Sequence, residues 1–371
     1  MAFKNLRLVS GYAHFMRKAL PWVEDAKDPP LELGSLYFID ELSELMLGEV
    51  ADVVPTRSSE YSTEQQPFKQ LFPNLKITPD PEARRSIILN FPALEARSFP
   101  LLPLFAHEIG HTVVTKYGLV DKVLSKSRAD SDFAKALKES KTALMEHQKI
   151  NLFRANLIIE ERLELWTTEL LCDQLAMQHL GPSYLLAFSA YVLPLSWDAP
   201  GPRHPPTTFR IARLLNWVAK TPWEDMLRTR LPVSLAWLEK ASSSPHGLGP
   251  ALSLLLDALD QAQAHLSSVV SETLDHNVYA AGSYLELSGY LDEQLQHEIL
   301  PVQHPVTRKP FDPRAILIAG WLSLHEEAAE AAADGETPAT LCEALSNWNS
   351  NAFFTKALEL SRVLNIWEQT K

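Results

Sequence analysis

The chain has 371 residues, of which 46% are hydrophobic, and a formal net charge of −12 at neutral pH. This composition allows a sizeable core and argues against wholesale disorder. The acidic balance disfavours non-specific nucleic-acid binding, because such binding depends on neutralising phosphates with Lys and Arg. We therefore expect no nucleic-acid partner.

The two cysteines, Cys172 and Cys342, are isolated and form no C-x-x-C pair. We interpret them as reduced thiols of a cytoplasmic protein. The N-terminal segment has no continuous apolar region of the kind found in secretory signals. The longest apolar runs, such as PRAILIAGWLSL, are too short to cross a bilayer. We therefore expect a soluble protein without a membrane span.

The first hundred residues predict a helix followed by a small sheet. An amphipathic helix is expected near residues 39–49, and the polar, proline-broken segment 62–83 is interpreted as loop. Residues Ser86–Phe91 are rich in apolar and β-branched side chains and stop at Pro92, which indicates a strand. We expect the small sheet to lie near residues 50–92.

Helical patterns dominate from there to residue 220. Residues 99–118 are mostly apolar, and residues 119–149 are polar and uninterrupted by Gly or Pro. We interpret the latter as a surface segment, with residues 121–149 as a possible gate of the cleft. A long helix is predicted over residues 150–180, ending at Gly181 before Pro182. Another helix begins near Thr207 after a Pro/Gly-rich loop.

The last third of the chain is again helical, with breaks at residues 241–250 and 301–314. The predicted fold class is α+β, mainly α-helical. We divide the chain into residues 1–220, which include the predicted active-site helices 99–118 and 150–180, and a helical C-terminal domain, residues 221–371, packed on the first.

The apolar helix 99–118 contains His107, Glu108 and His111 in an H-E-x-x-H pattern. Residues four apart lie on one helical face, so both imidazoles can bind the same metal ion. Glu108 then faces the open position of that metal, where it can act as general base toward water. One zinc ion per chain suits two imidazoles and a carboxylate. Gly110, in the middle of the helix, indicates close packing against a neighbour.

The third ligand is expected on helix 150–180, where Glu169 and Asp173 lie four residues apart in an apolar run. Glu169 would bind the metal, while Asp173 would accept the free N–H of a ligand histidine and fix its tautomer. Three other acids of this helix are interpreted as a solvated face: Glu160, Glu161 and Glu164. We interpret Cys172 as a small buried residue that points away from the site.

The two segments AHEIGH and ELLCDQLA together resemble those of the gluzincin zinc metallopeptidases, the H-E-x-x-H … E-x-x-x-D group that includes thermolysin. A long gap between His111 and Glu169, and the later segment RHPPTTFRIARLL, are similar to the CAAX-prenyl-protease type of gluzincin. The chain departs from that type in lacking transmembrane helices. The resemblance covers roughly residues 85–218 and implies a zincin-like catalytic domain.

The resemblance also implies where a substrate would lie. The strand Ser86–Phe91 would be an edge strand above the site, and a peptide would pair with Ile88, Leu89 and Asn90. A further donor should stabilise the oxyanion of the scissile carbonyl. The matching segment favours His204 and Arg210 as catalytic donors. Two alternatives are Tyr184 and Tyr191, for which a core role is favoured.

Two functions follow from these patterns. The first is a zinc metallopeptidase that cleaves a peptide or protein substrate, with Glu108 as general base. The alternative is a latent or non-catalytic zinc-binding protein on a peptidase fold, held in check by a regulatory protein or by the chain itself. Either a long insertion over the cleft or a donor from the C-terminal domain in the fourth zinc position would do this, and His304 and Cys342 are two such donors. A purely structural zinc needs no base, so Glu108 favours the enzyme.

Overall fold

The computed structural model describes residues 31–49, 51–58, 61–65, 85–92, 98–192, 201–243, 247–274, 278–333 and 350–369. The elements up to residue 192 are α2 (Leu33–Leu47), β1 (Ala51–Ser58), β2 (Ser62–Gln65), β3 (Arg85–Pro92), the 3-10 helix η2 (Phe99–Leu101), α4 (Leu104–Tyr117), α5 (Leu119–Ser127), α6 (Ser131–Gln148), α7 (Leu152–Leu180) and α8 (Pro182–Val192). The later helices are α9 (Thr207–Val218), α10 (Trp223–Arg230), α11 (Pro232–Ser242), α12 (Pro250–Gln261), α13 (Gln263–Leu274), α14 (Ala281–Gln296), α15 (Pro313–Ala333) and α17 (Asn351–Gln369).

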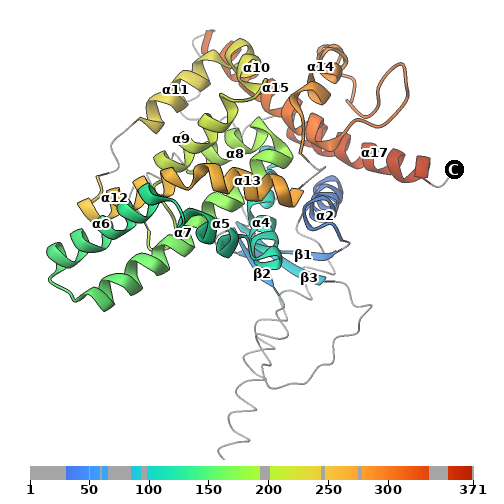
Figure 1. The fold of residues 1–371 in the computed structure, drawn as a ribbon. Helices are drawn as coiled ribbons and strands as arrows, with labels where there is room; N and C mark the ends of the chain where they lie inside the picture. Colours follow the sequence, from blue (N-terminus) through green and yellow to red (C-terminus); the bar gives the residue numbers. More distant parts are fainter. Residues whose placement is uncertain are drawn as a thin grey trace, which may run out of the picture.

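The described residues form a mostly helical α+β fold with a small sheet, as the sequence predicts (Figure 1). The sheet has three strands in the order β1-β3-β2. Strand β1 runs parallel to β3, and β2 runs antiparallel to it. In β3 every residue from Ile87 to Phe91 is buried, which is typical of a strand covered on both faces.

The expectation that Ser86–Phe91 forms an edge strand is wrong, because β3 is the central strand. Ile88 faces Val54 of β1 on one side and Glu64 of β2 on the other, so its backbone lies in two ladders. A peptide therefore finds no open edge at Ile88, Leu89 or Asn90. The error arose from β2, a short polar segment that we interpreted as loop.

Helices α4 and α7 position the motif residues, and both agree with the predicted helices. Gly118 ends α4 in a left-handed conformation, and its N–H bonds the carbonyls of the last turn. The side chain of Asn151 caps the start of α7 by accepting from Arg154 N at 2.9 Å. Gly181 closes its other end, where its N–H bonds Met177 O.

The polar segment 119–149 forms α5 and α6, which the carboxylate of Asp130 separates as the N-cap of α6. Helix α6 packs against α7 and α12, and Ser140 Oγ donates to Ala251 O at 2.7 Å. This segment is thus part of the helical layer beside α7. Among the described helix pairs that pack closely, α6 is not paired with α4, which carries the motif residues.

Helices from the end of the chain lie against helices from its beginning (Figure 1). Trp321 Nε1 of α15 donates to Pro100 O at 3.0 Å. Helix α17 packs on α2, where a Cβ at Gly34 would overlap the carbonyl oxygen of Thr355. The predicted division at residue 220 stays a prediction. Helices α15 and α17, which follow this position, contact Pro100 and α2, which precede it. In the described part of the chain, no helix is both long and apolar enough to cross a membrane.

Candidate metal centre

The site lies where α4 packs against α7, and Gly110 allows the close approach. A Cβ atom added at Gly110 would lie 3.2 Å from Cα and 3.3 Å from Cβ of Cys172. Both contacts are tighter than ordinary van der Waals packing, so a hydrogen atom at this position lets the two backbones approach. This close packing explains why α4 has a glycine in its interior, where glycine is otherwise unfavourable.

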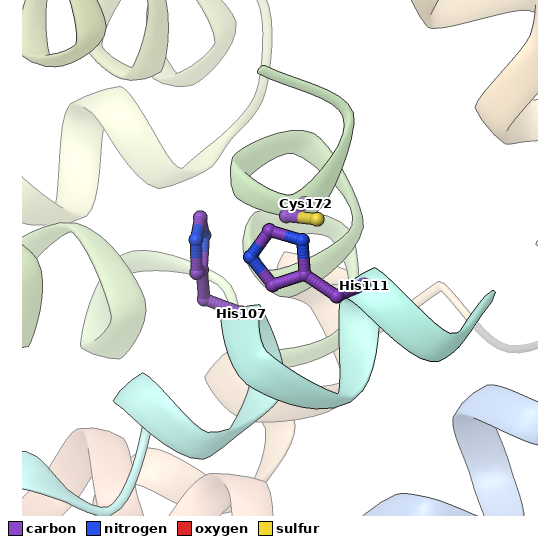
Figure 2. A group of neighbouring side chains, drawn as sticks. All are labelled: His107, His111 and Cys172. Carbon is purple, nitrogen blue, oxygen red and sulfur yellow. The ribbon is translucent and has the colours of Figure 1, made fainter. Parts of the chain in front are cut away.

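His107, His111 and Cys172 form a group that can hold a metal ion. One ring nitrogen of each histidine and the sulfur of Cys172 all lie within 4.8 Å of one another. Figure 2 shows the two imidazoles rising from successive turns of α4 toward the thiol on α7. The interpretation of Cys172 as pointing away from the site is therefore wrong, although the residue is fully buried and packs on Gly110.

Glu169 also lies beside the two imidazoles. Its Oε2 is 3.3 Å from His107 Nε2, and its Oε1 is 3.6 Å from His111 Nε2. Ligand atoms that surround a tetrahedral zinc ion stand roughly 3.3 Å apart. Glu169 Oε2 is buried and makes no hydrogen bond among the described atoms, although Arg210 Nη1 lies 3.5 Å from it. Glu169 and Cys172 are thus the two candidates for a third ligand beside His107 and His111.

Asp173 lies behind His107, on the side away from Glu169. Its Oδ1 is 3.0 Å from His107 Nδ1 and accepts the hydroxyl of Tyr184 at 2.6 Å. Arg210 donates from Nε to Oδ2 at 2.7 Å and from Nη2 to Oδ1 at 2.6 Å. Asp173 can thus hold the Nδ1–H tautomer of His107, which leaves Nε2 to face Glu169.

The other predicted donors take different places around this centre. The guanidinium of Arg210 is buried, and its Nη1 lies 3.5 Å from Glu169 Oε2. Its Nε and Nη2 donate to Asp173, so the guanidinium of Arg210 is directed toward the carboxylates of Asp173 and Glu169. His204 has a half-exposed side chain, and its Nε2 lies 3.7 Å from Glu169 Oε2. His204 is therefore the better placed of the two to contact a substrate.

Tyr184 belongs to the site, although the sequence favours a core role for it. Its side chain is fully buried, its hydroxyl lies 3.2 Å from His107 Nδ1, and its ring is nearly parallel to that imidazole. Tyr191 lies at the cavity with its ring edge-on to Tyr61. An aromatic residue of an apolar helix gives no sequence signal for the partner of its hydroxyl, which depends on how α8 crosses α4.

Glu108 is held by strand β2. Thr63 Oγ1 donates to the backbone oxygen of Glu108 at 2.7 Å and lies 3.3 Å from its carboxyl Oε2. Burial raises the pKa of the Glu108 carboxyl to about 7. A carboxyl with such a pKa can both take and return a proton near neutral pH. Among the described elements, β2 is therefore the edge strand that contacts the motif.

The motif residues open into a cavity of about 420 Å³. The polar part of its lining is formed by site residues: His107, Glu108, Glu169, His204 and Arg210. The apolar part is mainly aromatic and aliphatic: Tyr61, Leu104, Phe188, Tyr191 and Val192. None of residues 121–149, all of which the structure describes, lines this cavity, so the expected gate is not found there.

Negative charge exceeds positive charge at this centre when the histidines are neutral. The carboxyl groups of Glu108, Glu169 and Asp173 are all buried beside a single buried guanidinium. Burial alone would lower the pKa of His107, but Asp173 and Glu169 raise it to about 10. Burial and the neighbouring His107 lower the pKa of His111 to about 4. A proton on His107 thus offsets part of the excess negative charge of the carboxylates, and a divalent cation would offset more of it.

Arg210 and His107 likewise act on Glu169. Burial alone would raise the pKa of this carboxyl, but its contact with His107 and the charge of Arg210 lower it to about 2. Glu169 is therefore an anion at any physiological pH, as a metal ligand must be. The donor set of two imidazoles, a carboxylate and a nearby thiol fits zinc.

The remaining sequence candidates lie elsewhere. Glu160 forms ion pairs with Arg128 and Lys141, as expected of a solvated face. His304 Nδ1 accepts from the backbone N–H groups of Val306 and Thr307 in a turn and does not line the cavity. Cys342 lies outside the described residues.

No protein-family model, curated protein or solved structure matches this chain. Its function has therefore to be inferred from the chemistry of the site.

Proposed function

We propose that this protein is a zinc-dependent peptidase of the gluzincin type, with a zincin-like arrangement of α4 and α7. His107, His111 and Glu169 would hold the zinc ion. The observation that carries the proposal is the short spacing between Glu169 and both imidazoles, at the cavity that also takes the Glu108 carboxyl. A zinc ion held there would supply a Lewis acid that polarises a carbonyl and makes bound water more acidic.

The residues of this chain would divide the remaining work. Glu108 would accept a proton from the attacking water at its carboxyl and return it to the leaving amine, a role supported by its pKa of about 7. His204, half-exposed at the cavity, would donate to the developing oxyanion. Asp173 would hold His107 in the tautomer that leaves Nε2 free for the metal.

Strand β2 would hold an extended peptide substrate. Tyr61, which precedes it, lines the cavity, and Thr63 contacts Glu108. The edge of β2 that faces away from β3 pairs with no other strand of the described residues. A peptide added there would lie beside the general base.

The second candidate is a non-catalytic zinc-binding protein, and the observation that favours it is the position of Cys172. A His107, His111 and Cys172 site would have a thiolate ligand, as structural zinc sites often do. Glu108 then needs no catalytic role.

Metal content and peptide cleavage separate the two. Wild type, Glu169→Ala, Cys172→Ala and Glu108→Gln are purified, their zinc is measured, and a mixed peptide pool is incubated with each and analysed by mass spectrometry. The peptidase proposal expects zinc in wild type and Glu108→Gln, loss in Glu169→Ala, and cleavage by wild type that Glu108→Gln abolishes. Zinc loss only in Cys172→Ala, without cleavage by wild type, would favour the second candidate.

A further inference from the structure

Helix α9 is tied to the metal centre by the buried guanidinium of Arg210, which pairs with Asp173 and also lies 3.5 Å from Glu169 Oε2. Arg210 and Asp173 are 37 positions apart in the chain, and both are buried. The guanidinium uses Nε and Nη2 on the two oxygens of the carboxylate, in the bidentate geometry that fixes direction as well as distance. The ring of Phe188 lies beneath it, 4.4 Å from Cζ.

The same carboxylate also holds His107. Oδ1 of Asp173 accepts from Arg210 and Tyr184 and faces His107 Nδ1. Three groups therefore share Oδ1, and the hydrogen bonds from Arg210 and Tyr184 hold this oxygen at the position where it meets His107 Nδ1. Removal of Arg210 would leave Asp173 free to rotate, and the imidazole would lose the partner that orients Nε2.

We propose that Arg210 is a positioning residue that sets the metal affinity of the site by holding Asp173 against His107, so that a tightly bound metal requires docked α9. The proposal rests on the metal centre proposed above. It gives Arg210 a role different from the oxyanion donor expected from sequence, because its Nε and Nη2 are engaged behind the metal ligand.

Arg213 of the same helix provides a matched control. It is as buried as Arg210, pairs with Asp260, bonds Gln263 Oε1 at 2.7 Å, and lies over the ring of Phe209 with Cζ 4.9 Å from the centroid. Its partners are not residues of the metal centre. Arg213→Gln therefore removes an equally buried guanidinium from α9, one whose ion-pair partner Asp260 is exposed, without touching Asp173.

The test measures zinc affinity of the full chain by competition with a chromophoric chelator, together with the visible spectrum of the cobalt-substituted protein. We expect Arg210→Gln to bind zinc about 10–100-fold more weakly than wild type, which is the usual effect of losing a partner of a ligand histidine. Its cobalt spectrum should also change. Arg213→Gln should retain the wild-type affinity and spectrum.

Tyr184→Phe gives a second reading if Arg210→Gln does not fold. It removes another donor to Asp173 with little change of volume and should weaken zinc in the same direction. Wild-type affinity in Arg210→Gln or, if that variant does not fold, in Tyr184→Phe would overturn the positioning role, while the peptidase proposal would stand. Equal weakening in Arg210→Gln and Arg213→Gln would also overturn it, because the effect would then come from the fold. Absence of zinc from the wild type would refute both proposals.

Discussion

Replacing Gly110 by alanine tests the close approach of α4 and α7. Alanine at a helix interior is favoured over glycine by about 1 kcal/mol. At this position the new methyl group would meet Cα and Cβ of Cys172 at 3.2 and 3.3 Å. Overpacking of this kind typically costs about 1–3 kcal/mol. The two effects oppose each other, so we expect Gly110→Ala to be neutral to destabilising by about 2 kcal/mol.

Gly289→Ala isolates the packing effect, because Gly289 lies within α14 and nothing stands within 4 Å of its added Cβ. It should stabilise the protein by about 1 kcal/mol. Urea denaturation of the metal-free protein would then separate the two variants by about 1–3 kcal/mol. Gly110→Ala should also weaken zinc binding, because a larger distance between α4 and α7 would move Glu169 away from the imidazoles. Equal stabilisation by both substitutions would refute the packing argument.

Four further outcomes are expected at the site. Glu108→Gln should keep the metal and slow peptide hydrolysis by about 10²–10⁴-fold, the usual contribution of a general base, and wild-type turnover would contradict this role. Zinc binding near pH 7.5 should release about one proton from His107, because its pKa of about 10 keeps the imidazole charged until the metal binds. Zinc affinity should therefore rise with pH up to about 10. Calorimetry in buffers of different ionisation enthalpy measures the released proton, and a binding heat that does not depend on the buffer would contradict it. In the metal-free chain, protonated His107 stabilises the fold. This stabilisation is fully present below pH 6.5, the pKa of an unfolded histidine, and urea denaturation should show it lost as pH rises toward 10. A cobalt-loaded wild type should lack a thiolate charge-transfer band if Glu169 is the third ligand, and a band that Cys172→Ala removes would identify the thiol instead.

The sequence predicted the parts of the site that depend on helix periodicity. His107 and His111 share a face because they are four residues apart on α4, and the same rule placed Glu169 and Asp173 together on α7. Gly110 signalled close packing because glycine is unfavourable inside a helix. Such local rules hold wherever the helix forms.

The errors concern features that depend on distant partners. Strand β2 is four residues of polar sequence, and only its pairing with β3 makes it a strand and moves β3 to the centre of the sheet. Cys172 lies near the imidazoles because of the angle at which α7 crosses α4, which no spacing within α7 reveals. The hydroxyl of Tyr184 reaches Asp173 because of how α8 packs against α7.

The packing of α17 on α2 has a consequence for how the chain folds. Glu41 and Arg362 pair across this contact at 3.5 Å, and the buried Phe38 and Ile39 lie on α2. During synthesis α2 emerges long before α17, so the face of α2 that α17 covers stays exposed until that later helix has been made. Contacts between such distant segments slow folding and leave apolar surface exposed to aggregation or chaperones meanwhile. Removal of α17 should therefore lower solubility during expression more than its distance from the metal centre suggests.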